Sequence, residues 1–370
     1  QYILKYKHKI SKREVNIIIS TVDSFYFNIT DINYNNTDPF STLVENFLND
    51  ISKIDQYNGK IKFAGQEIYL NKKTQIWIDE AQDLPEKNLY AMTKLMLTTG
   101  IDVGIIGDKL QSLQFNINML TKIEDDNLIN INIIRPPIEN NNRRIKVKGL
   151  ANEINKYIEF EEYGLPQISV DEEKLEDYDK PFEILKLPNI YTNEKNQKNI
   201  EEYCKKIIKK LQKEIIKHNY LPQDILISSP ILKGRVELIE LKSKLEEMWI
   251  NLFNDKKYIE NLTNEYWIKN NHNIKGNFVE YVQLHKSETG KAINLDESIY
   301  KTRIVSVITS KGDGRNVSLV LNINEQSLKK LSNNKINLIY ESYIHVALTR
   351  AKKKIFFSLL ENGDDIHKRF

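Results

Sequence analysis

Short apolar runs that alternate with helical stretches are the feature that most restricts the fold of this chain. Four such runs occupy residues 17–20, 76–78, 103–106 and 131–134. Between the second and third runs, apolar residues from Leu89 to Met96 recur at the spacing of one helix face, and Pro85 stands where the first turn of a helix tolerates proline. A strand, a helix and a further strand in succession indicate a parallel sheet covered by helices. The first half is therefore predicted to be an α/β domain.

The second half repeats this alternation after a stretch rich in proline and asparagine at residues 136–142. Strands are predicted at residues 225–228, 304–308, 317–321 and 355–359, and helices near residues 150–158, 200–215 and 338–350. Residues 231–295 show no clear period, and we interpret them as a small helical insertion. A chain of 370 residues is long enough for two cores. We therefore expect domains at residues 1–138 and 139–370, each with a mainly parallel sheet flanked by helices.

The composition excludes several classes of protein. Hydrophobic residues make up 40% and charged residues 28% of the chain, a balance typical of a folded globular protein. Cys204, the single cysteine, falls on the apolar face of a predicted helix and is expected in the core, so a disulfide framework is excluded. No run reaches the roughly 18 apolar residues of a membrane span. We expect an intracellular protein with no membrane partner, whereas the net charge of +3 leaves a nucleic-acid partner open.

Residues 76–83 (IWIDEAQD) place two adjacent carboxylates directly after an apolar strand. At the carboxyl edge of a parallel sheet, Asp79 can hold Mg²⁺ through water, and Glu80 can orient a water that attacks a γ-phosphate. A solvated acidic loop after a strand would also contain such a pair. The full Asp-Glu-Ala-Gln-Asp string is much rarer than the pair, and it favours a site that hydrolyses a nucleotide.

Two further strings carry groups that are suited to phosphate. Residues 107–113 (GDKLQSL) follow another apolar strand, and the amide of Gln111 can bond a phosphate oxygen, although an ordinary Gly-Asp turn would look alike. Residues 346–352 (VALTRAK) end a helix with Arg350, whose forked cation can stabilise charge on a transferring phosphoryl group. A basic helix end that complements the helix dipole is the alternative interpretation of Arg350.

These three strings resemble motifs II, III and VI of superfamily 1 helicases of the UvrD, Rep and PcrA type, in that family's order. Residues 20–25 (STVDSF) resemble motif Ib, and residues 308–315 (ITSKGDGR) resemble motif V, in a variant similar to that of helicases from large DNA viruses. The resemblance runs from about residue 15 to residue 360. It implies two RecA-like domains, ATP and Mg²⁺ as cofactors, and 3′ to 5′ movement on single-stranded DNA, with unwinding of duplex DNA, in repair or replication.

The resemblance also implies roles for single residues. Asp79 would hold Mg²⁺, Glu80 would be the catalytic base, and Gln111 would couple the γ-phosphate to DNA. Arg350 would be the arginine finger, and Arg143 would be a second contact to phosphate. Contacts to nucleic acid would come from Thr21, Ser24, Phe115, Thr309, Ser310 and Lys311.

The sequence departs from the family's pattern at several points. Gly314 stands where motif V has a glutamate that binds the ribose, and Arg144 competes with Arg143 for the contact to phosphate. No Gly-x-x-x-x-Gly-Lys string followed by Ser or Thr occurs in the 370 residues, so the chain lacks the sequence of a phosphate-binding loop. We expect that this loop lies upstream of Gln1, which leaves the first domain N-terminally incomplete, and that residues 1–370 alone hydrolyse ATP negligibly.

Two functions therefore stay open. The first is an ATP-driven helicase that acts on single-stranded DNA or on a junction of single-stranded and duplex DNA. The second is a helicase-derived module that binds nucleic acid without hydrolysing ATP. The intact acid pair and Arg350 favour the first, because a pure scaffold has little need of them. RNA as a partner and the oligomeric state are not decided by the sequence, and cytoplasm, nucleus and viral factory all fit.

Overall fold

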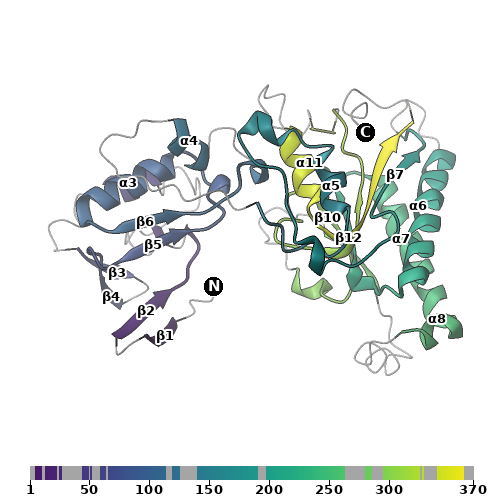
Figure 1. Ribbon diagram of the computed structural model, residues 1–370, viewed down its shortest axis with the longest axis horizontal. Helices are drawn as coiled ribbons and strands as arrows, with labels where there is room; N and C mark the ends of the chain where they lie inside the picture. The colour runs from purple at the N-terminus through teal and green to yellow at the C-terminus, as the bar shows by residue number, and fades with distance from the viewer. Residues whose placement is uncertain are drawn as a thin grey trace. The chain divides into compact units, whose positions relative to one another are not determined.

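The computed structural model describes residues 5–10, 13–22, 25–26, 44–49, 51, 59–63, 66–113, 119–125, 140–190, 197–262, 280–285, 295–325, 327–328 and 340–361. Its contacts divide the chain into a first unit, Gln1–Arg135, and a second unit, Pro136–Phe370 (Figure 1). The sequence places the boundary between residues 138 and 139, inside the same stretch rich in proline and asparagine. The two units are described separately below.

The centre of the first unit is a strand, a helix and a second strand. Strands β5 (Gln75–Ile78) and β6 (Asp102–Ile105) pair in parallel, and α3 (Lys87–Thr99) lies between them in the chain. The apolar stripe of α3 is buried in a core that also contains Ile78, as the helical spacing predicts. The helix ends at Gly100, which adopts a left-handed conformation (φ 71°) that glycine tolerates, and the Gly100 amide donates to the Met96 carbonyl. The predicted strand-helix-strand segment is therefore confirmed.

On the face of this strand pair opposite the α3 core, the indole of Trp77 lies close to the backbone of Gly104. Trp77 of β5 lies beside Gly104 of β6, and a methyl group added at Gly104 would come within 2.3 Å of the Trp77 ring. The indole thus covers the glycine backbone. Trp77 is nevertheless 66% exposed, because this face of the strand pair is open to solvent at that point.

Two antiparallel pairs accompany the parallel one. Strand β1 (Lys5–Ile10) pairs with β2 (Arg13–Ile18), and β3 (Lys60–Phe63) pairs with β4 (Gln66–Tyr69). The prediction of a mainly parallel sheet in the first domain is therefore not confirmed in the described residues, where β5 and β6 form a parallel pair and the other two pairs are antiparallel. The apolar run at residues 17–20 corresponds to the end of β2, and its partner is a strand in which lysines alternate with other residues. The run predicted at residues 131–134 lies outside the described residues.

The remaining elements of the first unit are short. Among the described residues they include the 3-10 turns η2 (Ala81–Asp83) and η3 (Lys109–Gln111) and the helix α4 (Met119–Asp125), and residues 44–49 are helical as well. The turns η2 and η3 directly follow the loops that leave β5 and β6. They place the carboxylates of the acid string (residues 76–83) and the residues of the Gln111 string (residues 107–113) at the same edge of the strand pair.

The second unit is built on a six-stranded sheet whose neighbouring strands all run parallel. The strand order is β7 (Phe182–Leu187), β12 (Ala351–Leu360), β11 (Arg315–Val320), β8 (Ile225–Ser229), β10 (Thr302–Ser306) and β9 (Val282–Leu284). Helices α6 (Gln197–His218) and α7 (Val236–Asn254) lie on one side of the sheet, and α5 (Leu150–Asn155) and α11 (Tyr340–Leu348) on the other (Figure 1). The smaller elements are α8 (Lys256–Glu260), η4 (Phe160–Tyr163), η5 (Glu172–Lys174), η6 (Pro222–Asp224) and η7 (Asp296–Ser298).

This arrangement explains why the central strands are apolar on both faces. Every residue of β8 is buried, since helices cover a parallel sheet from both sides. The mixed α/β architecture with a parallel sheet is confirmed here, and it is consistent with a RecA-like domain.

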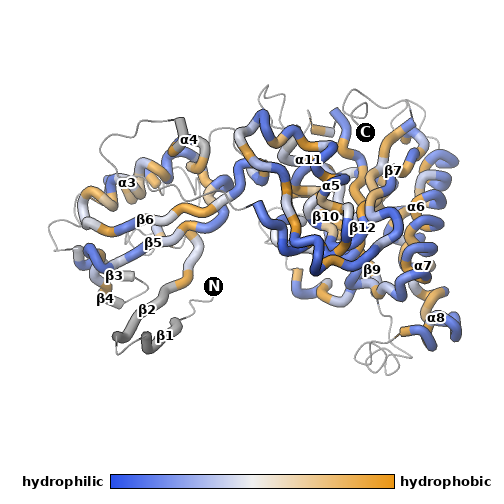
Figure 2. The backbone as a smooth tube through the Cα atoms, viewed as in Figure 1, coloured by the Kyte–Doolittle hydropathy of each residue, from blue (hydrophilic) through white to orange (hydrophobic). Residues whose placement is uncertain are grey.

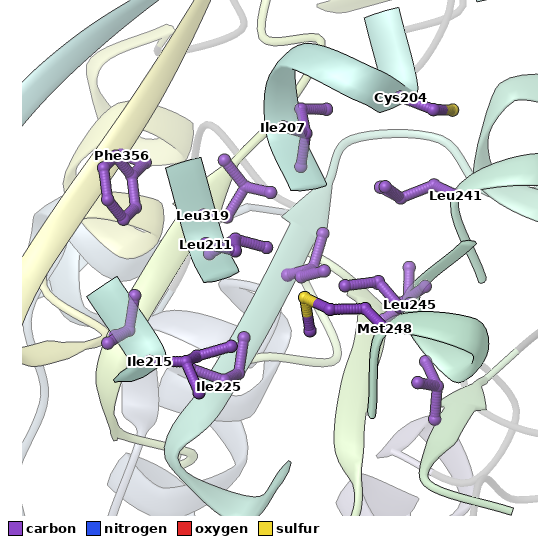
Figure 3. Close-up of a cluster of buried hydrophobic side chains, with 14 of the residues drawn as sticks. Cys204, Ile207, Leu211, Ile215, Ile225, Leu241, Leu245, Met248, Leu319 and Phe356 are labelled. Atoms are coloured by element: carbon purple, nitrogen blue, oxygen red, sulfur yellow. The ribbon is translucent and has the colours of Figure 1, made fainter. Parts of the chain in front are cut away.

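The core between the helices and the sheet follows the apolar stripe of α6. Cys204, Ile207, Leu211 and Ile215 recur along one face of α6 and point toward α7 and the strands (Figure 3). Each buried aliphatic side chain of this kind contributes about 1.5–3 kcal/mol relative to an exposed one. Lysines and glutamates occupy much of the rest of α6, so a large part of its tube is coloured hydrophilic (Figure 2). Burial raises the pKa of the Cys204 thiol to about 12, which fits the predicted core role.

The segment predicted as an insertion is part of the second unit's core. Helix α7 packs against α6, and β9 forms the edge of the six-stranded sheet beside β10. Trp249 of α7 is fully buried, and its indole N–H donates to Thr302 Oγ1 on β10 at 3.0 Å. The interpretation of residues 231–295 as a separate insertion is therefore wrong for the described parts. None of the described helices combines the length and apolar character needed to cross a membrane.

Candidate functional site

The acid string leaves β5 through an unusual turn. Asp79 and Glu80 follow the last residue of the strand, and both side chains are exposed. Asp79 Oδ1 accepts a hydrogen bond from the Glu80 amide at 3.0 Å. Glu80 has a left-handed backbone (φ 54°, ψ 39°), which is uncommon for a residue other than glycine. Such conformations concentrate at functional sites, where the surrounding structure holds them.

Gln82 joins this turn to the loop after β6. The Gln82 side chain is fully buried, its Nε2 donates to Glu80 Oε2, and its Oε1 accepts from the Asp108 amide at 3.0 Å. Gly107 makes this approach feasible, because a methyl group there would lie 2.3 Å from Gln82 Oε1. Gln82 belongs to the string at residues 76–83, but the sequence alone did not indicate that its side chain links the loops after β5 and β6.

Asp108 extends the link to Gln111. Asp108 Oδ1 accepts from the Leu110 amide and caps η3, and its Oδ2 accepts from Gln111 Nε2, both at 3.0 Å. The structure thus brings Glu80 and Gln111 into one hydrogen-bonded network, with Gln82 and Asp108 between them. Within the described residues, no group of three or more histidine, cysteine, aspartate or glutamate side chains could hold a metal ion.

In the second unit, three distant strings meet around Arg144. Arg144 Nη1 donates to the Thr349 carbonyl at 2.9 Å. A methyl group at Gly314 would lie 2.7 Å from Arg144 Nε and 2.8 Å from its Cδ. The Arg144 side chain therefore passes directly over Gly314. Arg143, which the sequence favoured, is exposed, and its carbonyl accepts from Lys146 Nζ at 3.1 Å.

Arg350 is held by the end of its own helix. The residue is 2% exposed, its Nε donates to the Val346 carbonyl at 2.8 Å, and its Nη2 donates to Thr349 Oγ1 at 2.9 Å. The Arg350 carbonyl accepts from the Arg315 amide at 3.0 Å, which ties the end of α11 to the start of β11. This conformation is the dipole-complementing one that the sequence left open as the alternative.

The residues predicted to contact nucleic acid differ in their surroundings. Ser310 is fully buried, and its hydroxyl donates to the Val307 carbonyl at 2.7 Å. Thr309 Oγ1 lies 2.7 Å from Ser306 Oγ, and both Thr309 and Lys311 are partly exposed just after β10. Thr21 is exposed after β2, and its carbonyl accepts from the Phe25 amide at 2.9 Å. Ser24 and Phe115 lie outside the described residues.

A buried ion network supports the loop between β10 and β11. Arg303 Nη1 donates to Asp313 Oδ2 at 2.7 Å, and Arg315 Nε lies 3.6 Å from the same oxygen. Burial lowers the pKa of the Arg315 guanidinium to about 10. Carbonyls of the surrounding loops accept from both guanidinium groups, so these buried charges are paired and hydrogen-bonded. Apart from the unusual Asp-Gly-Arg ending of residues 308–315, no sequence pattern indicated this network.

The contact between Arg144 and Gly314 can be measured. We expect Gly314→Ala to lower the free energy of unfolding by about 1–3 kcal/mol, because the new methyl group would overlap the Arg144 side chain. In an Arg144→Ala background the same change should cost less, since the space is then vacant. Urea unfolding of the four proteins completes the cycle, and an equal cost in both backgrounds would contradict the contact.

The sequence and the structure were compared with those of known proteins. No family model matches the sequence, and no curated protein matches it. Among solved structures, 80 chains match. One is the C-terminal domain of a possible DNA helicase from Lactobacillus plantarum WCFS1, which is 11% identical, with 61% of this chain and 92% of that chain covered and a TM-score of 0.30.

Proposed function

We propose that this protein is an ATP-driven helicase or translocase of superfamily 1, of the UvrD, Rep and PcrA type, that moves 3′ to 5′ on single-stranded DNA and unwinds duplex DNA. The observation that carries the proposal is the network at the edge of β5 and β6. It gathers the exposed pair Asp79 and Glu80 with the amide of Gln111, which come from separate strings of the sequence. A carboxylate pair beside an amide supplies groups that bind Mg²⁺ and orient the attacking water in phosphoryl transfer.

The first unit would supply the chemistry of hydrolysis. Mg²⁺ is commonly bound by one or two carboxylates together with substrate phosphates and water, so the exposed Asp79 suits it without a larger cluster of acids. ATP bound there supplies the phosphoryl group that is transferred. Glu80 would accept the proton of the attacking water, and Gln111 would contact the γ-phosphate. Thr21 and the residues Ser24 and Phe115 would contact nucleic acid.

The second unit would supply cations and further contacts to nucleic acid. Arg350 would stabilise charge on the transferring phosphoryl group, after its guanidinium leaves the Val346 carbonyl and the Thr349 hydroxyl that it now bonds. Arg143 and Arg144 are both candidates for a second phosphate contact, and the place of Arg144 beside Thr349 supports Arg144. Thr309, Ser310 and Lys311 would position the backbone of single-stranded DNA or of a junction. We propose an intracellular site of action, in repair or replication.

A nucleic-acid-binding module without ATPase activity is the second candidate. It is favoured by one observation, the lack of a Gly-x-x-x-x-Gly-Lys string followed by Ser or Thr in the 370 residues. Both candidates would bind single strands through a groove that contacts phosphate, and they differ in turnover.

Hydrolysis and binding assays distinguish the two candidates. For the product of the complete gene, we expect ATP hydrolysis that rises when single-stranded DNA is added. Affinity for the strand should fall by roughly tenfold or more between about 50 and 200 mM salt, because contacts to phosphate release counterions. Salt-sensitive binding without hydrolysis would establish the binding module, and salt-independent binding would count against the groove.

A further inference from the structure

Two turns of the first unit, after β5 and after β6, are fixed to each other by hydrogen bonds to backbone carbonyls. The Ala81 amide donates to the Ile106 carbonyl at 3.0 Å, and Ser112 Oγ donates to the Gln82 carbonyl at 3.2 Å. These bonds hold the turns together, but neither involves the side chain of Glu80. The link to the Glu80 carboxylate is made by the side chain of Gln82.

The chemistry of a carboxamide accounts for glutamine at this position. A backbone N–H can only donate, so the oxygen of Gln82 faces Asp108, and its nitrogen faces the Glu80 carboxylate, which accepts. Glutamate at position 82 could accept from the Asp108 amide but would place a second carboxylate against Glu80. Methionine has nearly the same length and can make neither bond. The role therefore needs one donor and one acceptor on a buried side chain.

The chain of bonds continues past Asp108 to the amide of Gln111. Four residues, Glu80, Gln82, Asp108 and Gln111, are thus connected from one turn to the other, with the Asp108 backbone amide bonding Gln82 and the Asp108 carboxylate bonding Gln111. We propose that Gln82 is a positioning residue that makes the orientation of the base Glu80 depend on the loop that carries Gln111. The inference rests on the proposed function, and it makes hydrolysis responsive to whatever moves that loop.

Gly107 leaves the space through which the Gln82 side chain reaches the loop after β6. A methyl group there would lie 2.3 Å from Gln82 Oε1, which is closer than atoms approach without a shift, and 3.2 Å from the Ala81 nitrogen, which is a tight contact. Gly107 has no left-handed backbone that would demand glycine. Glycine is therefore required at this position by the passage of the Gln82 side chain rather than by backbone conformation.

Steady-state kinetics on the product of the complete gene test the proposal. Gln82→Met should lower kcat for ATP by roughly 10²-fold, the scale of a misplaced catalytic group, and should leave the KM for ATP within about twofold. Stimulation of hydrolysis by single-stranded DNA should be lost as well. Gln75→Met is the matched control, since Gln75 is an exposed glutamine on β5, the strand that precedes the turn containing Gln82, and it should leave kcat unchanged.

A second readout needs no hydrolysis. The Asp108 amide donates to Gln82, so in nucleotide-free protein its hydrogen exchange should become about fivefold faster or more in Gln82→Met and in Gly107→Ala. Gln82→Glu keeps the acceptor and should leave this exchange unchanged, yet it should lose turnover, because it cannot donate to Glu80. Unchanged exchange together with lost turnover in Gln82→Glu distinguishes loss of the bond between Gln82 and Glu80 from a general loss of structure. If Gln82→Met does not fold, Gln82→Glu takes its place in the test.

The outcomes divide clearly. Faster exchange at Asp108 together with reduced kcat supports the role of Gln82. Wild-type kcat in both Gln82→Met and Gln82→Glu, or unchanged exchange in Gln82→Met, overturns the inference and leaves the proposed function standing. A wild-type protein that does not hydrolyse ATP overturns the proposed function and this inference together.

Discussion

Glu80→Gln should lower kcat for ATP hydrolysis by roughly 10³-fold while the affinities for nucleotide and for single-stranded DNA stay close to those of the wild type. The amide fills the space of the carboxylate, and its oxygen can still accept from Gln82 Nε2, so the turn should keep its structure. What the amide cannot do is accept the proton of the attacking water. Steady-state kinetics and equilibrium binding on the product of the complete gene measure the three quantities.

The control for this variant is Glu86→Gln. Glu86 precedes α3 in the same unit, and its side chain makes no capping hydrogen bond to the helix. The same chemical change there should leave turnover unaffected. Hydrolysis at the wild-type rate in Glu80→Gln would mean that the acid string is not a hydrolytic site, and parallel losses of turnover and of nucleotide affinity would assign Glu80 to binding instead.

Arg350→Ala should also lower turnover by roughly 10³-fold, with a much smaller loss of affinity for single strands. The expected cause is the loss of a forked cation that stabilises charge on the transferring phosphoryl group. Arg350→Lys keeps one positive charge but not the fork, so it should lose most of the activity too. Because Arg350 is buried and bonds the Val346 carbonyl, both variants need an unfolding measurement beside the kinetics.

Lys352→Ala provides the comparison for Arg350. Lys352 is a partly exposed cation two residues further on, and its described bond to the Lys146 amide comes from its carbonyl, which the substitution retains. Turnover should be nearly unchanged in this variant. If Arg350→Ala lost turnover, strand affinity and stability in proportion, the residue would be structural, which is the role that its described conformation displays.

Much of the second unit's fold was predictable, since its central strands are apolar on both faces and its long helix carries a regular stripe. Strand β7 (Phe182–Leu187) was missed, because its sequence follows an acidic and lysine-rich stretch and includes a charged residue at every second or third position. Helix α7 was misread as an insertion. Its apolar residues do recur at helical spacing, but the aromatic residues around them obscured the period.

The first unit was predicted less well, for a physical reason. Residues of β1 are mostly lysine alternating with tyrosine, histidine and isoleucine, which indicates a local basic cluster as readily as a strand. Pairing with β2 depends on a register that composition does not reveal. In the site, the strings placed Glu80 and Gln111 at the ends of two strands, but the bridge through Gln82 depends on burial and on the missing side chain of Gly107. Both depend on how residues distant in the sequence pack together, which the sequence patterns do not reveal.

The exposed indole of Trp77 gives the first unit an intrinsic optical probe. Trp77 lies on β5 two residues before Asp79, with its ring over the Gly104 backbone and most of its surface in water. Trp249 sits in the opposite environment, fully buried with its N–H bonded to Thr302, so these two of the chain's three indoles should emit at different wavelengths; the third, Trp267, lies outside the described residues. Fluorescence from the solvent-exposed indole can therefore follow events at the carboxylate pair in the unlabelled protein, and Trp77→Phe would identify its share of the signal.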